Sequence, residues 1–177
     1  MKILVLNGSI GKNSVPLVSM HLSQDFEVVT RPVLNEDLSI LKQKYDMWEH
    51  IPDSEVMGPL IDAMDVAKDD ISSIEPDLII GVQLGCAVLS NLIVDKVWSG
   101  PAVMIDPDGI FYIDETTESK EKVVWFVRKN DKSFVRKNLS KVPSFKIGTT
   151  IYVNDENDMN SLHTMSIVKN VVRSLCS

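Results

Sequence analysis

The segment with the clearest chemical signature is residues 81–85, GVQLG, with Gln83 at its centre. Glycine two positions before and two positions after a central residue is typical of a nucleophile elbow, a sharp turn from a strand into a helix. Such a turn holds its central residue in a strained conformation, and the neighbouring residues must be small. Cys86 and Ala87 continue the run of small residues. The alternative is that the two glycines only ease a tight connection between a strand and a helix.

Short aliphatic runs, which alternate with longer segments of helical period, must position this turn. Six runs predict strands, at residues 3–6, 26–30, 78–80, 102–105, 123–127 and 150–153. Most of them are continuously apolar, which is typical of strands covered on both faces. Helices are predicted at residues 55–74, 85–97 and 160–175, the first with Asp53 or Ser54 as its N-cap. This alternation predicts one α/β domain over residues 1–177, with three α/β/α layers and a mostly parallel sheet of about six strands.

In sheets of this kind, ligands bind outside the carboxyl ends of the strands, so the residues directly after each strand are site candidates. In its layout and in the GVQLG turn, the chain resembles the α/β-hydrolase superfamily, whose pattern at this turn is Gly-x-Ser-x-Gly. The layout is most similar to the small, lidless serine-hydrolase-like group around retinoblastoma-binding protein 9. The resemblance covers nearly the whole chain, from Met1 to the last helix. It implies an α/β-hydrolase-like fold.

The resemblance also implies positions for a catalytic triad. The acid of this family follows a late strand, which gives that role to Asp131, and its histidine follows the last strand, which gives that role to His163. The order of nucleophile, acid and histidine along the chain is that of the α/β-hydrolases. Asp131 could instead be the N-cap of a helix at residues 132–139, and His163 could be an ordinary surface residue.

Two backbone groups are the candidates for an oxyanion hole. In this family, the loop after the first strand supplies one N–H, which here falls on Ser9. The second would be the N–H of Leu84, directly after the central residue of the turn. Both donors belong to the main chain, so they are independent of side-chain identity.

Gln83 occupies the position at which this family has its serine. A glutamine amide is neither a nucleophile nor an acid, and it cannot form an acyl-enzyme. We therefore predict a degenerate triad of Gln83, Asp131 and His163 in a binding or regulatory module that is non-catalytic or weakly active. The expected ligand is a small molecule with a carbonyl or carboxylate group.

Two other functions stay open. The first is an esterase-like hydrolase that activates water directly or uses a relocated nucleophile. Its candidate groups are the His163–Asp131 pair, Ser9, Ser14 and Cys86. The second is a flavodoxin-like reductase, because residues 2–9 also resemble a strand and Gly-Ser turn that cradle an FMN phosphate. Against it, no aromatic residue follows the third strand to stack on a flavin, and the GVQLG segment has no role.

Charge and composition argue against several other classes. The net charge of −7 disfavours a nucleic-acid partner, since such proteins usually carry a basic patch. The three histidines are scattered and the two cysteines lack a metal-ligand spacing, so we expect no metal and no cofactor. No apolar run approaches bilayer length and the first residues do not form a signal peptide. We therefore expect a cytoplasmic protein with reduced cysteines and no membrane partner.

Overall fold

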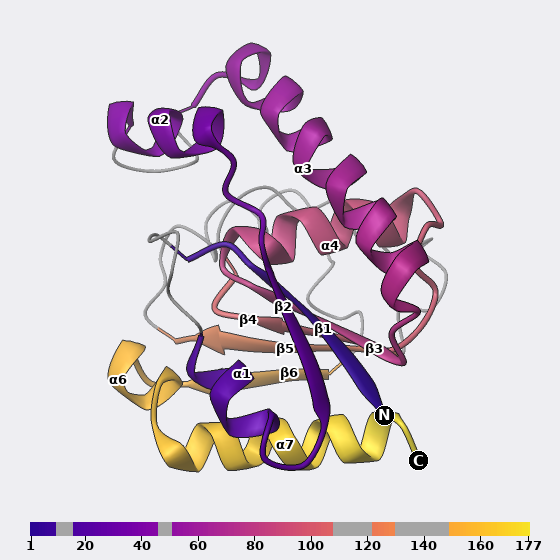
Figure 1. Cartoon of the computed structure of the whole chain (residues 1–177). Coiled ribbons are helices and arrows are strands. Elements are labelled where there is room, and N and C mark those ends of the chain that lie inside the picture. Colours follow the sequence, from indigo (N-terminus) through magenta and orange to yellow (C-terminus); the bar gives the residue numbers. More distant parts are fainter. Residues whose placement is uncertain (10–15, 46–50, 108–121, 130–148) are drawn as a thin grey trace.

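Six parallel strands form the centre of the molecule in this computed structural model, which describes residues 1–9, 16–45, 51–107, 122–129 and 149–177 (Figure 1). They are β1 (Lys2–Asn7), β2 (Glu27–Pro32), β3 (Leu78–Val82), β4 (Ala102–Ile105), β5 (Val123–Arg128) and β6 (Thr149–Val153). Their order across the sheet is β2-β1-β3-β4-β5-β6, and every neighbouring pair is parallel. The predicted strands and the predicted α/β fold class are therefore confirmed.

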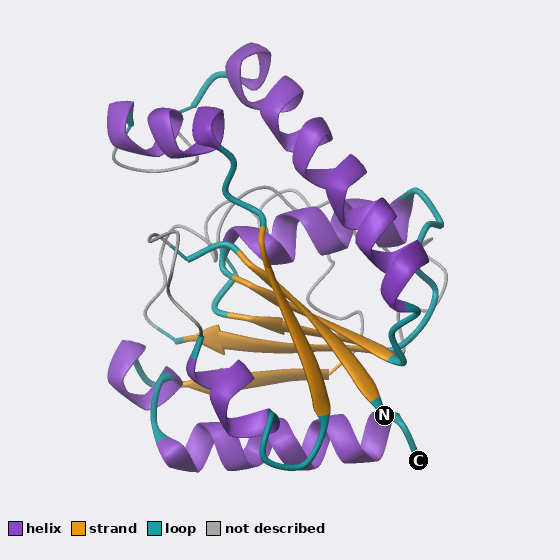
Figure 2. Cartoon of the chain, viewed as in Figure 1, coloured by secondary structure: helices purple, strands orange, loops and turns teal. Residues whose placement is uncertain are grey.

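Helices cover both faces of this sheet (Figure 2). On one face lie α2 (Glu36–Lys44), α3 (Asp53–Ile74) and α4 (Leu84–Val94). On the other face lie α1 (Leu17–Leu22), α6 (Glu156–Met159) and α7 (Leu162–Leu175). Within the described ranges, every helix is too short or too polar to cross a lipid bilayer.

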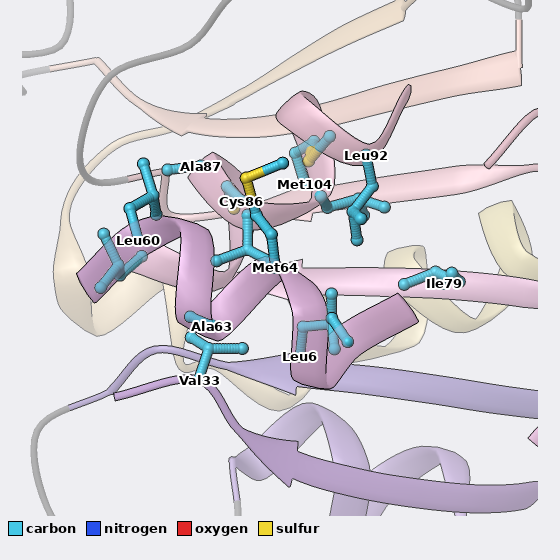
Figure 3. Packing of buried hydrophobic residues seen from close by; sticks show 14 of the residues in the cluster. Leu6, Val33, Leu60, Ala63, Met64, Ile79, Cys86, Ala87, Leu92 and Met104 are labelled. Atoms are coloured by element: carbon cyan, nitrogen blue, oxygen red, sulfur yellow. The ribbon is translucent and has the colours of Figure 1, made fainter. Parts of the chain in front are cut away.

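The inner strands are buried on both faces, which explains why their sequences are continuously apolar. In β1, Leu4 and Leu6 belong to the core beneath α3 and α4, whereas Ile3 and Val5 belong to the core above α1 and α7. Successive side chains of a strand point to opposite faces, so a strand between two helical layers needs apolar residues at every position. Figure 3 shows part of the first core, where residues of α3 and α4 meet β1 and β3.

The structure corrects three helix boundaries. The helix α3 starts directly after Pro52, so the predicted N-cap at Asp53 or Ser54 is wrong. The ring of Pro52 already fixes a φ of −59°, and the N-cap position makes no side-chain hydrogen bond. The helix α4 ends at Val94 and does not reach the predicted end at Val97, because Lys96 adopts a left-handed φ of 59° that is incompatible with a helix. The last predicted helix, at residues 160–175, starts at Leu162 as α7, and Ser161 caps it by accepting a hydrogen bond from the N–H of Thr164. The short α6 precedes the predicted range.

Candidate functional site

The loops after β1 and β3 lie at the point where the chain changes its direction of travel across the sheet. From β1 the chain passes to β2 at one edge, and it then returns to β3 on the other side of β1. Ligands of open α/β sheets bind at such points, outside the carboxyl ends of the strands. Here β1 ends at Asn7 and is followed by Gly8 and Ser9, and Gln83 follows β3.

Gln83 is the single residue between the end of β3 and the start of α4. Its φ is 52° and its ψ is −119°, a combination that is strained for any residue other than glycine. Hydrogen bonds fix the turn on both sides: the N–H of Gln83 donates to the carbonyl of Ile105 at 3.0 Å, and its own carbonyl accepts from the N–H of Cys86 at 2.9 Å. The strand-to-helix turn predicted for residues 81–85 is confirmed.

The glycines around this turn are required because α4 crosses the sheet at very short range. A Cβ on Gly85 would lie 1.9 Å from the carbonyl oxygen of Leu6 in β1. A Cβ on Gly81 would lie 2.8 Å from the backbone of Cys86, and one on Gly8 would lie 2.5 Å from the nitrogen of Leu84. All of these neighbours are backbone atoms, which cannot rotate away as a flexible side chain can.

Gln83, Asp106 and Arg128 form a polar cluster, named here the edge cluster, at the carboxyl ends of β3, β4 and β5. The Nε2 of Gln83 lies 3.5 Å from Oδ2 of Asp106, and the Nε of Arg128 lies 2.5 Å from Oδ1 of the same carboxylate. The Asp106 side chain is only 10% exposed, and its φ of 49° is a second strained backbone position at this edge. Strained residues of this kind concentrate at functional sites.

Asp106 and Arg128 were not predicted as site residues, although the sequence carries a usable signal for both. Asp106 directly follows the apolar run at residues 102–105, and Arg128 directly follows the run at residues 123–127. Both positions lie at the carboxyl ends of predicted strands, where site residues collect. The rule that selected Gln83 would have selected both of them.

The side chain of the last residue of β1 closes the loop that follows this strand. Asn7 is buried, and its Oδ1 accepts a hydrogen bond from the N–H of Ser9 at 3.0 Å. The N–H of Gly8 donates to the carbonyl of Val82 at 2.9 Å. To act in an oxyanion hole, the N–H of Ser9 would have to leave the side chain of Asn7 and donate to a ligand instead. The predicted oxyanion role of Ser9 stays a prediction. The N–H of Leu84 lies at the start of α4, where no carbonyl of the same helix can accept from it.

His163 lies on the exposed side of the first turn of α7, next to the buried Thr164 and Met165. The start of α7 follows the carboxyl end of β6 through α6, so His163 lies toward the same edge of the sheet as Gln83 (Figure 1). It lies on the face opposite α4. Asp131 lies outside the described residues, so its pairing with His163 stays a prediction.

Cys86 lies in the first turn of α4 and is fully buried, which disfavours it as a relocated nucleophile (Figure 3). Its Sγ lies 3.1 Å from the carbonyl oxygen of Gly81 and 3.4 Å from that of Ile105. A thiol held against backbone carbonyls in the core does not meet a substrate. Ser14, another candidate, lies outside the described residues, whereas Ser9 is partly exposed.

Asp106→Asn should lower the free energy of unfolding by about 1–3 kcal/mol, because the guanidinium of Arg128 would lose its charged partner in a mostly buried site. Urea titration measures this, with Arg128→Gln and the double variant completing a double-mutant cycle. If the double variant shows the sum of the two single losses, the two groups are not coupled and the ion pair has no role in holding this edge.

Comparisons with known proteins agree with this architecture. No protein-family model matches the chain, and no curated protein matches it significantly. Among solved structures, it is similar to a candidate hydrolase of the alpha/beta superfamily from Xanthomonas campestris pv. campestris, with a TM-score of 0.60, 10% identity and 98% of both chains covered. It is also similar to an alpha/beta hydrolase enzyme from a Medee basin deep-sea metagenome library, with a TM-score of 0.52, 14% identity, and 98% of this chain and 82% of that chain covered.

These similarities show that the chain has an α/β-hydrolase-like fold. Both neighbours are described as hydrolases, so the comparisons favour this fold over the flavodoxin-like alternative. At such low identity, activity does not follow from the fold, because one fold supports many functions.

Proposed function

We propose that this protein is an α/β-hydrolase-fold binding or regulatory module that does not carry out acyl transfer. The observation that carries the proposal is the strained backbone of Gln83, with φ 52° and ψ −119°, between β3 and α4. In a nucleophile elbow this position supplies the attacking hydroxyl. Here the side chain is an amide whose nitrogen lone pair is delocalised, so the position lacks a nucleophile.

The proposed ligand is a small molecule with a carbonyl or carboxylate group. One N–H of the Gln83 amide is directed at Asp106, which leaves the second N–H and the amide oxygen to contact a ligand. The adjacent N–H of Leu84, at the start of α4, favours an oxygen with partial or full negative charge. Gln83 and the N–H of Leu84 therefore offer donors for an oxygen atom, whereas residue 83 has no hydroxyl or thiol that could attack the adjacent carbon.

In this proposal, Gln83, Asp131 and His163 occupy the three positions of a degenerate triad. The order of these residues along the chain and the place of His163 at the start of α7 support the assignment. Membership of the lidless group around retinoblastoma-binding protein 9 is part of the same proposal, and it rests on the layout of the elements alone.

The proposal is tested by comparing hydrolysis of 4-nitrophenyl acetate by the wild type and by Gln83→Ala. We expect the same slow rate for both, since neither protein has a nucleophile at residue 83. Circular dichroism melting curves serve as the control for folding. Fast turnover that disappears in Gln83→Ala would contradict a non-catalytic site. Fast turnover that disappears in Ser9→Ala instead would favour a relocated nucleophile.

A further inference from the structure

A groove of about 350 Å³ lies apart from the edge cluster, between α3 and the segment that leads from β2 into α2. Its floor is apolar and consists of Leu6 from β1, Val33 after β2, and Ala63 and Ala67 from α3. None of its lining residues belongs to the edge cluster. The proposed function therefore does not involve this groove.

The groove exists because α3 has small residues where it passes the end of β2. The apolar stripe of this helix includes the larger Leu60 and Met64, but alanine occupies positions 63 and 67, one turn apart. Figure 3 shows Ala63 beside Val33, with Leu6 close by. Larger side chains at the two alanine positions would fill the space between the helix and the sheet.

Both rims of the groove are acidic. Asp62 and Asp70 lie on α3, two turns apart, while Glu36 and Asp37 lie in the first turn of α2. The Nε of Arg31 pairs with Oδ1 of Asp70 at 2.9 Å. The other three carboxylates have no ion-pair partner in the part of the chain that the structure describes. Glu36 and Asp37 interact favourably with the dipole of α2, but that role does not account for Asp62.

Hydrogen bonds hold the two rims at a fixed separation. The Nδ2 of Asn35 donates to the carbonyl of Pro59 in α3 at 2.9 Å. At the other end of α2, Lys44 and the hydroxyl of Tyr45 both donate to the carboxylate of Glu55, each at 2.8 Å. The hydrogen bonds from Lys44 and then from Tyr45 lower the pKa of Glu55, because both stabilise its charged form. The groove is therefore formed before any ligand binds.

We propose that this groove binds a small organic cation, a primary amine carried on an apolar body. Its volume falls within the range of roughly 300–1,000 Å³ that is typical of small-molecule sites. The apolar part would cover the alanines of the floor and Val66, whose side chain is 59% exposed on the α3 rim. The three carboxylates without ion-pair partners favour a positive charge and disfavour a negative one.

The test uses 4-phenylbutylamine as the probe and the full chain labelled with ¹⁵N. We expect saturable binding in an NMR titration, with the largest amide shifts at Val33, Ala63 and Val66. The neutral 4-phenylbutanol should bind more weakly and 4-phenylbutyrate more weakly still, and added salt should weaken the binding of the amine. Equal affinity for the amine and the alcohol would overturn the proposal, as would shifts confined to other parts of the chain.

Two variants of α3 provide a matched comparison, because each removes one exposed carboxylate. Asp62 lines the groove and Asp69 does not. Asp62→Asn should weaken the binding of 4-phenylbutylamine by about two- to fivefold, the range expected for one exposed charge pair, while Asp69→Asn should leave it unchanged. An equal effect of both variants would show a general charge effect and overturn the proposal. Binding of a lysine-rich peptide without binding of the amine would also overturn it.

Discussion

Gly85→Ala should destabilise the protein by about 3 kcal/mol or more, at or beyond the upper end of typical overpacking costs. The new Cβ would lie 1.9 Å from the carbonyl oxygen of Leu6 and 2.8 Å from its carbonyl carbon. Leu6 is buried in a central strand, so relief requires that α4 move away from β1. The measurement is the free energy of unfolding from urea titration, monitored by circular dichroism.

Gly58→Ala is the control for this substitution. Gly58 lies in α3, and a Cβ there would have no heavy atom within 4 Å apart from its chain neighbours and the backbone of its own helix. We expect the free energy of unfolding of Gly58→Ala to stay within about 1 kcal/mol of the wild type. Alanine favours a helix more than glycine does, but Pro59 disfavours the helical conformation of a residue with a Cβ that precedes it, so the two effects oppose each other. Equal stability of the two variants would show that α4 does not approach β1 as closely as described.

Gln83→Ser should gain hydrolysis of 4-nitrophenyl acetate, with kcat/KM about 10²-fold above that of the wild type. The serine would occupy the strained turn that presents a nucleophile in this fold, with the N–H of Leu84 adjacent to it. Under the proposed triad, His163 would accept its proton and Asp131 would orient the histidine. General-base assistance of this kind contributes about 10²–10⁴ in rate, so even a partly formed triad should give a measurable gain.

The double variants Gln83→Ser/His163→Ala and Gln83→Ser/Asp131→Asn locate the source of that gain. Both should return the rate to the level of the wild type, because removing one member disables a catalytic unit. A folded Gln83→Ser variant without any gain would contradict the assignment of Asp131 and His163 to triad positions. The binding proposal has separate support, since it rests on Gln83 and on its contact with Asp106.

Most of the sheet could be predicted from local sequence because its strands are buried on both faces. A run such as residues 102–105 is apolar throughout and is bounded by polar or turn residues, so its ends are evident. The helix α2 was less accessible to prediction, because only Leu38 and Leu41 are buried in it and the helix is nine residues long. The start of α3 was misplaced because the apolar stripe begins later than the backbone turn that Pro52 sets.

The β3–α4 turn could be predicted because its signal is local: two glycines at a fixed spacing around Gln83. The edge cluster is different, since its geometry depends on the register between β4 and β5, in which Ile105 pairs with Phe126. That register brings Asp106 and Arg128 together from positions 22 residues apart in the sequence. The strand ends that carry Asp106 and Arg128 are evident in the sequence, but no sequence periodicity shows that the two side chains pair.

The most direct test of a non-catalytic site is the intact mass of the wild-type protein after exposure to a fluorophosphonate probe. Such probes form a covalent bond with an activated nucleophile and leave an adduct of known mass. We predict an unchanged mass for the wild type, because residue 83 is a glutamine and Cys86 is buried against backbone carbonyls. A stoichiometric adduct on the wild type, mapped by peptide analysis to Ser9, Ser14 or Cys86, would contradict the account.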